Sequence, residues 1–240
     1  MANGTLNRIV GENYARVMER VTRRRPLNQV TVVVVTKYVT LEAARAVIAA
    51  GATHLGENYI VPSVRKFDAL AAQGLSFTRH LIGPIQTNKA PQVVGKFEWV
   101  QTLDRPKVVD ALGKRIPAGA PKVSALIEVN IGREPQKSGC PPEDIAALAE
   151  HVLKYDGLVL RGLMAIPPVG APPDATRGHF AEMRRLFDAT KAALGDAAPR
   201  FDTLSLGMTA DFEAALDEGA NMVRIGSAFF DGIPDEYRVR

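Results

Sequence analysis

The stretch VTVVVVTKYV, residues 30–39, is an almost unbroken run of β-branched apolar side chains that ends on Thr36, Lys37 and Tyr38. β-Branched residues favour strands, and a strand without alternating polar residues is typical of a parallel sheet covered on both faces. The stretch therefore predicts a buried strand over residues 30–36 with Lys37 at its carboxyl end. Strand alternation predicts that Tyr38 turns away from the face that Lys37 uses and packs beneath the helices.

Similar short apolar segments alternate with helical patterns along the rest of the chain. They predict eight strands, at 30–36, 53–56, 79–83, 98–102, 122–130, 158–166, 202–206 and 221–225. The segments between them predict helices at 40–50, 58–73, 87–95, 105–115, 142–155, 174–194 and 209–219, with Thr40 and Thr209 as N-caps. This alternation favours an α/β fold, a (β/α)8 TIM barrel with an extra N-terminal helix. We expect residues 1–240 to form a single domain.

Composition excludes several other classes of protein. Hydrophobic residues make up 46% and charged residues 23% of the chain, which is ordinary for a soluble globular protein. No apolar run is long enough to span a bilayer, and the first residues lack the apolar core of a signal peptide. The single cysteine rules out an internal disulfide. We therefore expect a cytoplasmic protein with no membrane partner.

The net charge of +4 is only mildly basic. Its densest cluster lies late in the first helical segment and comprises Arg16, Arg20, Arg23, Arg24 and Arg25. A solvated helix face accounts for this cluster better than a phosphate-binding patch. No aromatic side chains interleave with it, so we expect no nucleic-acid partner. No His, Cys and carboxylate spacing indicates a metal site.

A TIM barrel carries its functional site at the carboxyl ends of its strands. Two late segments place small and hydroxyl residues there: LSLGMTADFEAAL at 204–216 and VRIGSAFF at 223–230. Loops after the seventh and eighth strands often bind phosphate, through glycines, hydroxyls and free N–H groups. The pattern favours phosphate binding over the alternative that Ser205 and Thr209 only cap a helix.

Lys37 lies at the same end of the predicted barrel. A lysine there can form a Schiff base with a carbonyl compound, although an exposed lysine at a strand end is the commoner case. Pyridoxal 5′-phosphate (PLP) carries an aldehyde and a phosphate on one ring. The combination of Lys37 with a phosphate site therefore indicates PLP as the cofactor.

Several segments in order resemble the PLP homeostasis protein family, which is similar to the N-terminal barrel of alanine racemase. Besides the two late segments, they are VVVVTK at 32–37, LGENY at 55–59, HLIGPIQTNK at 80–89, IEVNI at 127–131, QKSG at 136–139 and LRGLMAIP at 160–167. The resemblance covers most of the chain, and the combination of segments is far more specific than any one of them.

The resemblance implies a role for each of nine residues. Lys37 would carry PLP as an internal aldimine, and Arg224 would face the pyridine nitrogen. The residues that would hold the phosphate are Ser205, the backbone around Met208, Gly226 and Ser227. Those that would line the ring are Asn58, His80 and Met164.

Arginine opposite the pyridine nitrogen has a chemical consequence. Arg224 has no acceptor and does not deprotonate, so it can only donate to an unprotonated nitrogen, which makes the ring a weaker electron sink. Alanine racemase uses a second base from a separate β-domain. Because the chain ends about fifteen residues after its last predicted strand, we expect no such domain here.

These features predict a PLP carrier or buffer that acts in PLP homeostasis with little or no turnover, as a monomer, with PLP-dependent apoenzymes as recipients. The main alternative is a PLP-dependent amino-acid racemase-type enzyme, whose second base would come from Tyr59, His54 or His80. A more distant alternative is a barrel similar to phosphosugar isomerases, with Lys37 as a Schiff-base lysine.

Overall fold

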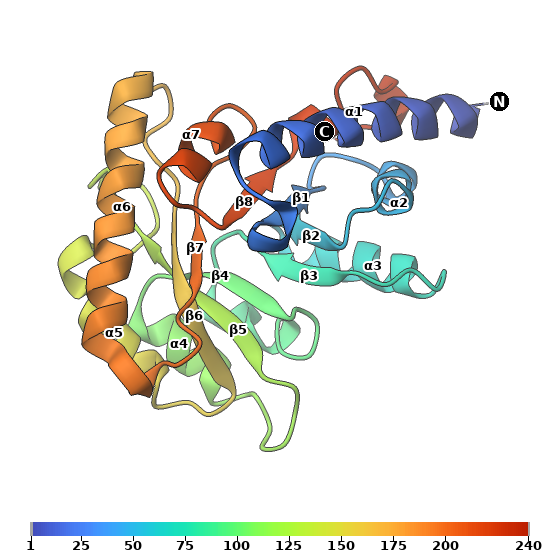
Figure 1. The fold of residues 1–240 in the computed structure, drawn as a ribbon. Coiled ribbons are helices and arrows are strands. Elements are labelled where there is room, and N and C mark those ends of the chain that lie inside the picture. Colours follow the sequence, from blue (N-terminus) through green and yellow to red (C-terminus); the bar gives the residue numbers. More distant parts are fainter. Residues whose placement is uncertain (1, 240) are drawn as a thin grey trace.

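The computed structural model describes residues 2–239, in which eight parallel strands form a closed barrel (Figure 1). The strands are β1 Thr31–Val35, β2 His54–Glu57, β3 Thr78–Leu81, β4 Trp99–Leu103, β5 Val123–Val129, β6 Leu158–Ala165, β7 Thr203–Ser205 and β8 Met222–Ile225. They follow one another around the barrel in chain order. The predicted (β/α)8 fold is confirmed, and each strand lies where the sequence placed it to within a few residues.

Strand β1 closes the barrel. It pairs with β2 on one side, where Val34 lies opposite Leu55, and with β8 on the other, where Val33 lies opposite Arg224. Val33 and Val34 point to opposite faces of β1 and both are buried, so the strand is covered on both faces, as its lack of alternation predicts. Closure leaves no free strand edge and brings the first and last strands of the chain side by side.

The two faces of the strands have different surroundings. Outward-facing residues such as Val34 and Leu163 belong to the main apolar core between strands and helices. A separate small cluster fills the inside of the barrel and consists of Val33, Leu126, Met164 and Met222. The buried polar residues His80, Gln101, Ser205 and Arg224 complete the barrel interior.

Six helices follow strands, as predicted. They are α2 Leu41–Ala49, α3 Ile60–Ala71, α4 Pro106–Gly113, α5 Ile145–Val152, α6 Pro173–Leu194 and α7 Phe212–Asp217. The helix predicted at 87–95 is wrong: Thr87–Gln92 forms the 3-10 helix η2, in which Pro91 provides no N–H for an α-helical bond. Thr209 is not an N-cap either, because α7 begins at Phe212 with Asp211 at that position. Thr40 does occupy the N-cap of α2, although its hydroxyl makes no capping bond.

Helix α1, Ala2–Arg24, takes the place that a helix after β8 has in a regular barrel. It packs against α2, α7 and the 3-10 helix η5, Ser227–Phe229 (Figure 1). Its buried Asn13 donates hydrogen bonds to the carbonyls of Phe229 at 3.1 Å and Asp231 at 2.8 Å. Helix α1 therefore supports, from behind, the loop that follows β8.

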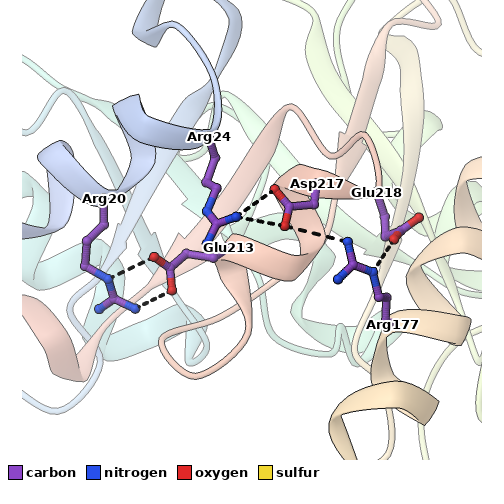
Figure 2. Close-up of polar contacts among 6 residues, drawn as sticks. All are labelled: Arg20, Arg24, Arg177, Glu213, Asp217 and Glu218. Carbon is purple, nitrogen blue, oxygen red and sulfur yellow. Dashed lines mark hydrogen bonds and ion pairs between the residues drawn. The ribbon is translucent and has the colours of Figure 1, made fainter.

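Ion pairs also join α1 to α7 (Figure 2). Another pair joins α6 to the carboxyl end of α7. Arg20 binds Glu213 at 2.8 Å, and Arg24 binds Asp217 at 3.1 Å. Arg177 of α6 binds the neighbouring Glu218 at 2.6 Å. Pairs this exposed contribute at most about 1 kcal/mol each. Two of the clustered arginines thus dock α1, so the cluster is more than a solvated helix face.

No helix among residues 2–239 combines the length and the hydropathy needed to cross a membrane.

Candidate functional site

A cavity of about 370 Å³ opens at the carboxyl ends of β1, β7 and β8. Five of the nine predicted site residues line it: Lys37, Met208, Arg224, Gly226 and Ser227. Thr209, Tyr38 and Phe230 also contribute to its wall. The barrel thus brings the lysine after the first strand together with the loops after the last two, as expected for a site at the strand ends.

Lys37 lies on a turn, because β1 ends at Val35. Strand alternation therefore stops before Tyr38, and both side chains face the same cavity. The Lys37 Nζ atom is 4.9 Å from the centroid of the Tyr38 ring, which is 56% exposed. The prediction that Tyr38 packs beneath the helices is wrong for this reason.

A buried ion pair on the outside of the barrel fixes this turn. Lys66 of α3 donates to the carbonyls of Thr36 and Val39 at 2.8 and 2.9 Å, on either side of Lys37. Its ammonium group also lies 2.9 Å from the Glu57 carboxylate, which accepts a bond from the Thr36 hydroxyl at 2.8 Å. Because both charged groups are largely buried, these bonds offset the cost of removing them from water.

The loops after β7 and β8 form the opposite wall. Gly207 has φ of 85°, and a Cβ atom there would lie 2.7 Å from Ala215 and from the Phe212 backbone, so only glycine fits this approach. The Thr209 hydroxyl accepts a 3.3 Å bond from the Gly226 N–H, which ties the two loops together.

Several main-chain donors remain free in these loops. Within residues 2–239, the N–H groups of Thr209, Ala210 and Ser227 make no hydrogen bond, whereas the Met208 N–H is taken by the Asp211 carboxylate at 2.6 Å. Free N–H groups beside the hydroxyls of Thr209 and Ser227 provide the donors that an anion needs. These are the loops in which the sequence predicts a phosphate site. In the backbone around Met208, the amides of Thr209 and Ala210 are free within the described chain, whereas that of Met208 itself is occupied.

Arg224 forms the floor of the cavity from inside the barrel. Its guanidinium donates from Nη1 to the Ser205 hydroxyl at 2.6 Å and from Nη2 to the Ala165 carbonyl at 3.0 Å. Burial lowers the pKa of Arg224 to about 10, with Glu128 and Asp211 acting in the opposite direction, so the group stays charged at neutral pH.

Ser205 lies behind Arg224 and not in the cavity wall. It is fully buried, and its hydroxyl accepts from Arg224 and donates to Gln101 at 2.8 Å. This geometry does not favour the expected contact with phosphate, whereas Thr209, which also carries a hydroxyl, lines the cavity. The place of Ser205 at the end of a predicted strand gave no information about its depth in the barrel.

Three other predicted residues also lie away from the Lys37 cavity. His80 and Met164 are fully buried inside the barrel. Asn58 lines a neighbouring cavity of about 490 Å³ together with Tyr59 and Lys89. Its Oδ1 atom is buried without a hydrogen-bond partner in the described chain, which is unusual for a buried amide.

Glu128 of β5 is a buried acid that the sequence did not single out. Its Oε2 atom has no partner within residues 2–239. Burial raises the pKa of the Glu128 carboxyl from 4.5 to about 7, and Asp104 adds to this effect while Arg224 opposes it. Glu128, Lys66 and Gln101 could not be recognised from residue type alone, because Lys66 and Gln101 act through partners distant in sequence and the properties of Glu128 come from its burial.

Replacing Lys66 with methionine should destabilise the protein and loosen the Lys37 turn. The change leaves the Glu57 carboxylate buried without its cation, so we expect the free energy of unfolding to fall by about 3 kcal/mol. The double variant Glu57→Gln with Lys66→Met should lose clearly less free energy of unfolding than Lys66→Met alone, as measured by urea unfolding. Lys96→Met, at a half-exposed pair with Asp68, is the control and should change little. Equal losses in Lys66→Met and in the double variant would contradict this explanation, because the unpaired Glu57 carboxylate would then carry no cost.

Glu128→Gln should make stability less dependent on pH. Between pH 4.5 and about 7 the folded protein keeps the Glu128 proton that the unfolded chain has released. The folded state then binds more protons, so this residue's contribution to stability falls as pH rises through that window. We expect the variant to gain about 2 to 3 kcal/mol over the original protein near pH 8 and nothing near pH 4.

Urea unfolding at these two pH values measures the difference, with exposed Glu150→Gln as the control. A gain of the same size at both pH values would contradict the assignment, because it would not depend on ionisation of Glu128.

Comparison with known proteins agrees with this geometry. The family model described as alanine racemase, N-terminal domain, matches residues 10–234. A pyridoxal phosphate homeostasis protein of Pseudomonas aeruginosa is 41% identical over 226 residues, which cover 92% of this chain and 94% of that protein. The protein of the same name from Haemophilus influenzae is 40% identical over 85% of both chains.

Solved structures give the same result. PipY of Synechococcus elongatus, in a structure with PLP bound, has a TM-score of 0.81 and 28% identity, covering 92% of this chain and 99% of that one. Alanine racemase from E. faecalis shares the fold, with a TM-score of 0.71 and 17% identity, and this chain covers 58% of it. By the family model and by relatives about 40% identical over most of their length, the chain belongs to the pyridoxal phosphate homeostasis protein family, whose barrel is that of the alanine racemase N-terminal domain.

Proposed function

We propose that this protein binds PLP reversibly through Lys37 and acts in PLP homeostasis as a carrier or buffer, with little or no turnover. One observation carries the proposal: the Lys37 amine, the anion donors of two loops and the Arg224 guanidinium line the same cavity. An amine that can link to an aldehyde, opposite donors for a phosphate, is the arrangement that PLP requires.

The residues present fit this ligand. The free N–H groups of Thr209, Ala210 and Ser227, with two hydroxyls, suit the phosphate. The unpartnered Asn58 Oδ1 offers an acceptor at the edge of the neighbouring cavity. Arg224 offers donors but no acceptor to the ring nitrogen. When bound, PLP supplies an electron-withdrawing ring, and Arg224 limits that property because it cannot hold a protonated ring nitrogen.

The relatives support the same proposal. The proteins of Pseudomonas aeruginosa and Haemophilus influenzae are named for pyridoxal phosphate homeostasis, and PipY has been solved with PLP bound. We extend the binding of PLP to this chain by these similarities and by its own Lys37 cavity. We also propose that it acts in the cytoplasm as a monomer and that PLP-dependent apoenzymes receive its PLP.

The racemase alternative finds less support in the geometry. A second base would have to reach the reacting atoms beside Lys37. Of the three candidates, His54 and His80 bind each other, with His80 fully buried in the barrel, and Tyr59 lines the neighbouring cavity. None of them lines the Lys37 cavity. A phosphosugar isomerase-like function has no support from the relatives named above.

Borohydride reduction after mixing with PLP should fix a pyridoxyl group on Lys37. Peptide mass spectrometry locates the modified residue, and the absorption band of the complex should disappear on reduction. Lys37→Ala should abolish both signals, whereas Lys89→Ala, which removes the lysine of the neighbouring cavity, should leave them unchanged.

Trapping on another lysine, or an unchanged band in Lys37→Ala, would contradict the proposal. Rapid loss of the α-hydrogen from amino acids in deuterated water, dependent on Lys37 at saturating PLP, would favour the racemase alternative.

A further inference from the structure

A chain of hydrogen bonds crosses the interior of the barrel from its amino-terminal end to Arg224. His54 Nδ1 lies 2.9 Å from His80 Nε2, and His80 Nδ1 lies 3.0 Å from Gln101 Nε2. The Gln101 Oε1 atom accepts from the Ser205 hydroxyl at 2.8 Å, and Ser205 in turn accepts from Arg224 at 2.6 Å. Five residues on five strands thus form one connected path.

The chemistry of its members fixes the direction of the chain. Arginine only donates, so Ser205 accepts from it and must give its own hydrogen to the Gln101 oxygen. The Gln101 amide nitrogen then donates to His80 Nδ1, which leaves the His80 proton on Nε2. That proton is donated to His54 Nδ1. Every donor in the chain therefore points away from the cavity, and every bond along it pairs a donor with an acceptor.

The pKa values agree with this direction. Burial lowers the pKa of His54, and burial together with the neighbouring His54 lowers the pKa of His80 well below its usual range. Both rings are therefore neutral, so each keeps one nitrogen as an acceptor. A protonated His54 would lose the acceptor that the His80 N–H needs.

Such a chain is costly to build. His80, Gln101 and Ser205 are fully buried, and the side chains of Val33, Leu126, Met164 and Met222 fill the space beside them. Apolar residues could fill the whole interior of a small barrel, and a buried polar network stabilises only when every member is satisfied. The chain ends on Arg224, the one member that reaches the Lys37 cavity.

We propose that Gln101 and His80 are positioning residues for Arg224. Through Ser205 they hold one edge of the guanidinium, while the Ala165 carbonyl holds Nη2, so that Arg224 keeps a fixed place in the wall of the Lys37 cavity. The effect of this positioning on a bound PLP ring rests on the proposed function. The hydrogen-bond chain itself is present without a ligand.

The first test needs no ligand. Nitrogen-15 NMR of labelled histidines in the full-length protein should show His80 and His54 both neutral and protonated on Nε2 near pH 7.5. Gln101→Leu should remove the single tautomer of His80, because its Nδ1 atom loses its donor. Met222→Leu is the matched control, since Met222 contacts the same amide at 3.2 Å without joining the chain. A His80 ring protonated on Nδ1 in the original protein would overturn the proposal.

The second test uses PLP as the probe. Gln101→Leu and Ser205→Ala should each shift the absorption maximum of the PLP complex and raise its dissociation constant about tenfold, while borohydride still traps PLP on Lys37. Ser205→Thr keeps the hydroxyl and should restore both properties, and Met222→Leu should change neither.

An unchanged spectrum and affinity in Gln101→Leu and Ser205→Ala would overturn the positioning role. Absence of trapping on Lys37 in the original protein would instead refute the proposed function. The NMR experiment would still show whether the hydrogen-bond chain from His54 to Arg224 has the proposed direction.

Discussion

The pairing of β1 with β8 is the interaction on which the candidate site depends. It places Val33 opposite Arg224 and closes the barrel, so that residues from the two ends of the sequence share one cavity. Closure alone does not hold Lys37, because β1 ends before it. The buried Lys66 ammonium binds two carbonyls of the turn and thereby fixes the backbone at Lys37.

The site therefore rests on supports outside its own wall. Lys66 holds the Lys37 turn from α3, and Asn13 holds the loop after β8 from α1. The Gln101 chain supports Arg224 from within the barrel. Rigid supports of this kind reduce the entropy that is lost when a ligand binds, because the site is already ordered. The Gln101 chain also gives a reason for the polar side chains in the interior of a small barrel.

Sequence patterns predicted the strands well because buried parallel strands are apolar throughout. They also predicted the loops of the site, because glycines and hydroxyls after the last two strands of a barrel are typical of phosphate binding. Neither the patterns nor the resemblance indicated depth in the barrel, so Ser205 and His80 were expected beside the ligand and lie buried inside the barrel. Alternation failed at Tyr38 because β1 ends at Val35 and the turn that follows does not continue the strand. The role of Lys66 could not be predicted, since its partners are backbone carbonyls about thirty residues away in the chain.

A crystal structure of the protein soaked with PLP would decide whether Lys37 and Arg224 hold one ligand between them. We expect continuous electron density from Lys37 Nζ to the ligand, the phosphate against Thr209, Gly226 and Ser227, and the ring nitrogen within hydrogen-bonding distance of Arg224. PLP bound beside Lys89 in the neighbouring cavity, or a ring nitrogen turned away from Arg224 towards a carboxylate, would contradict this arrangement.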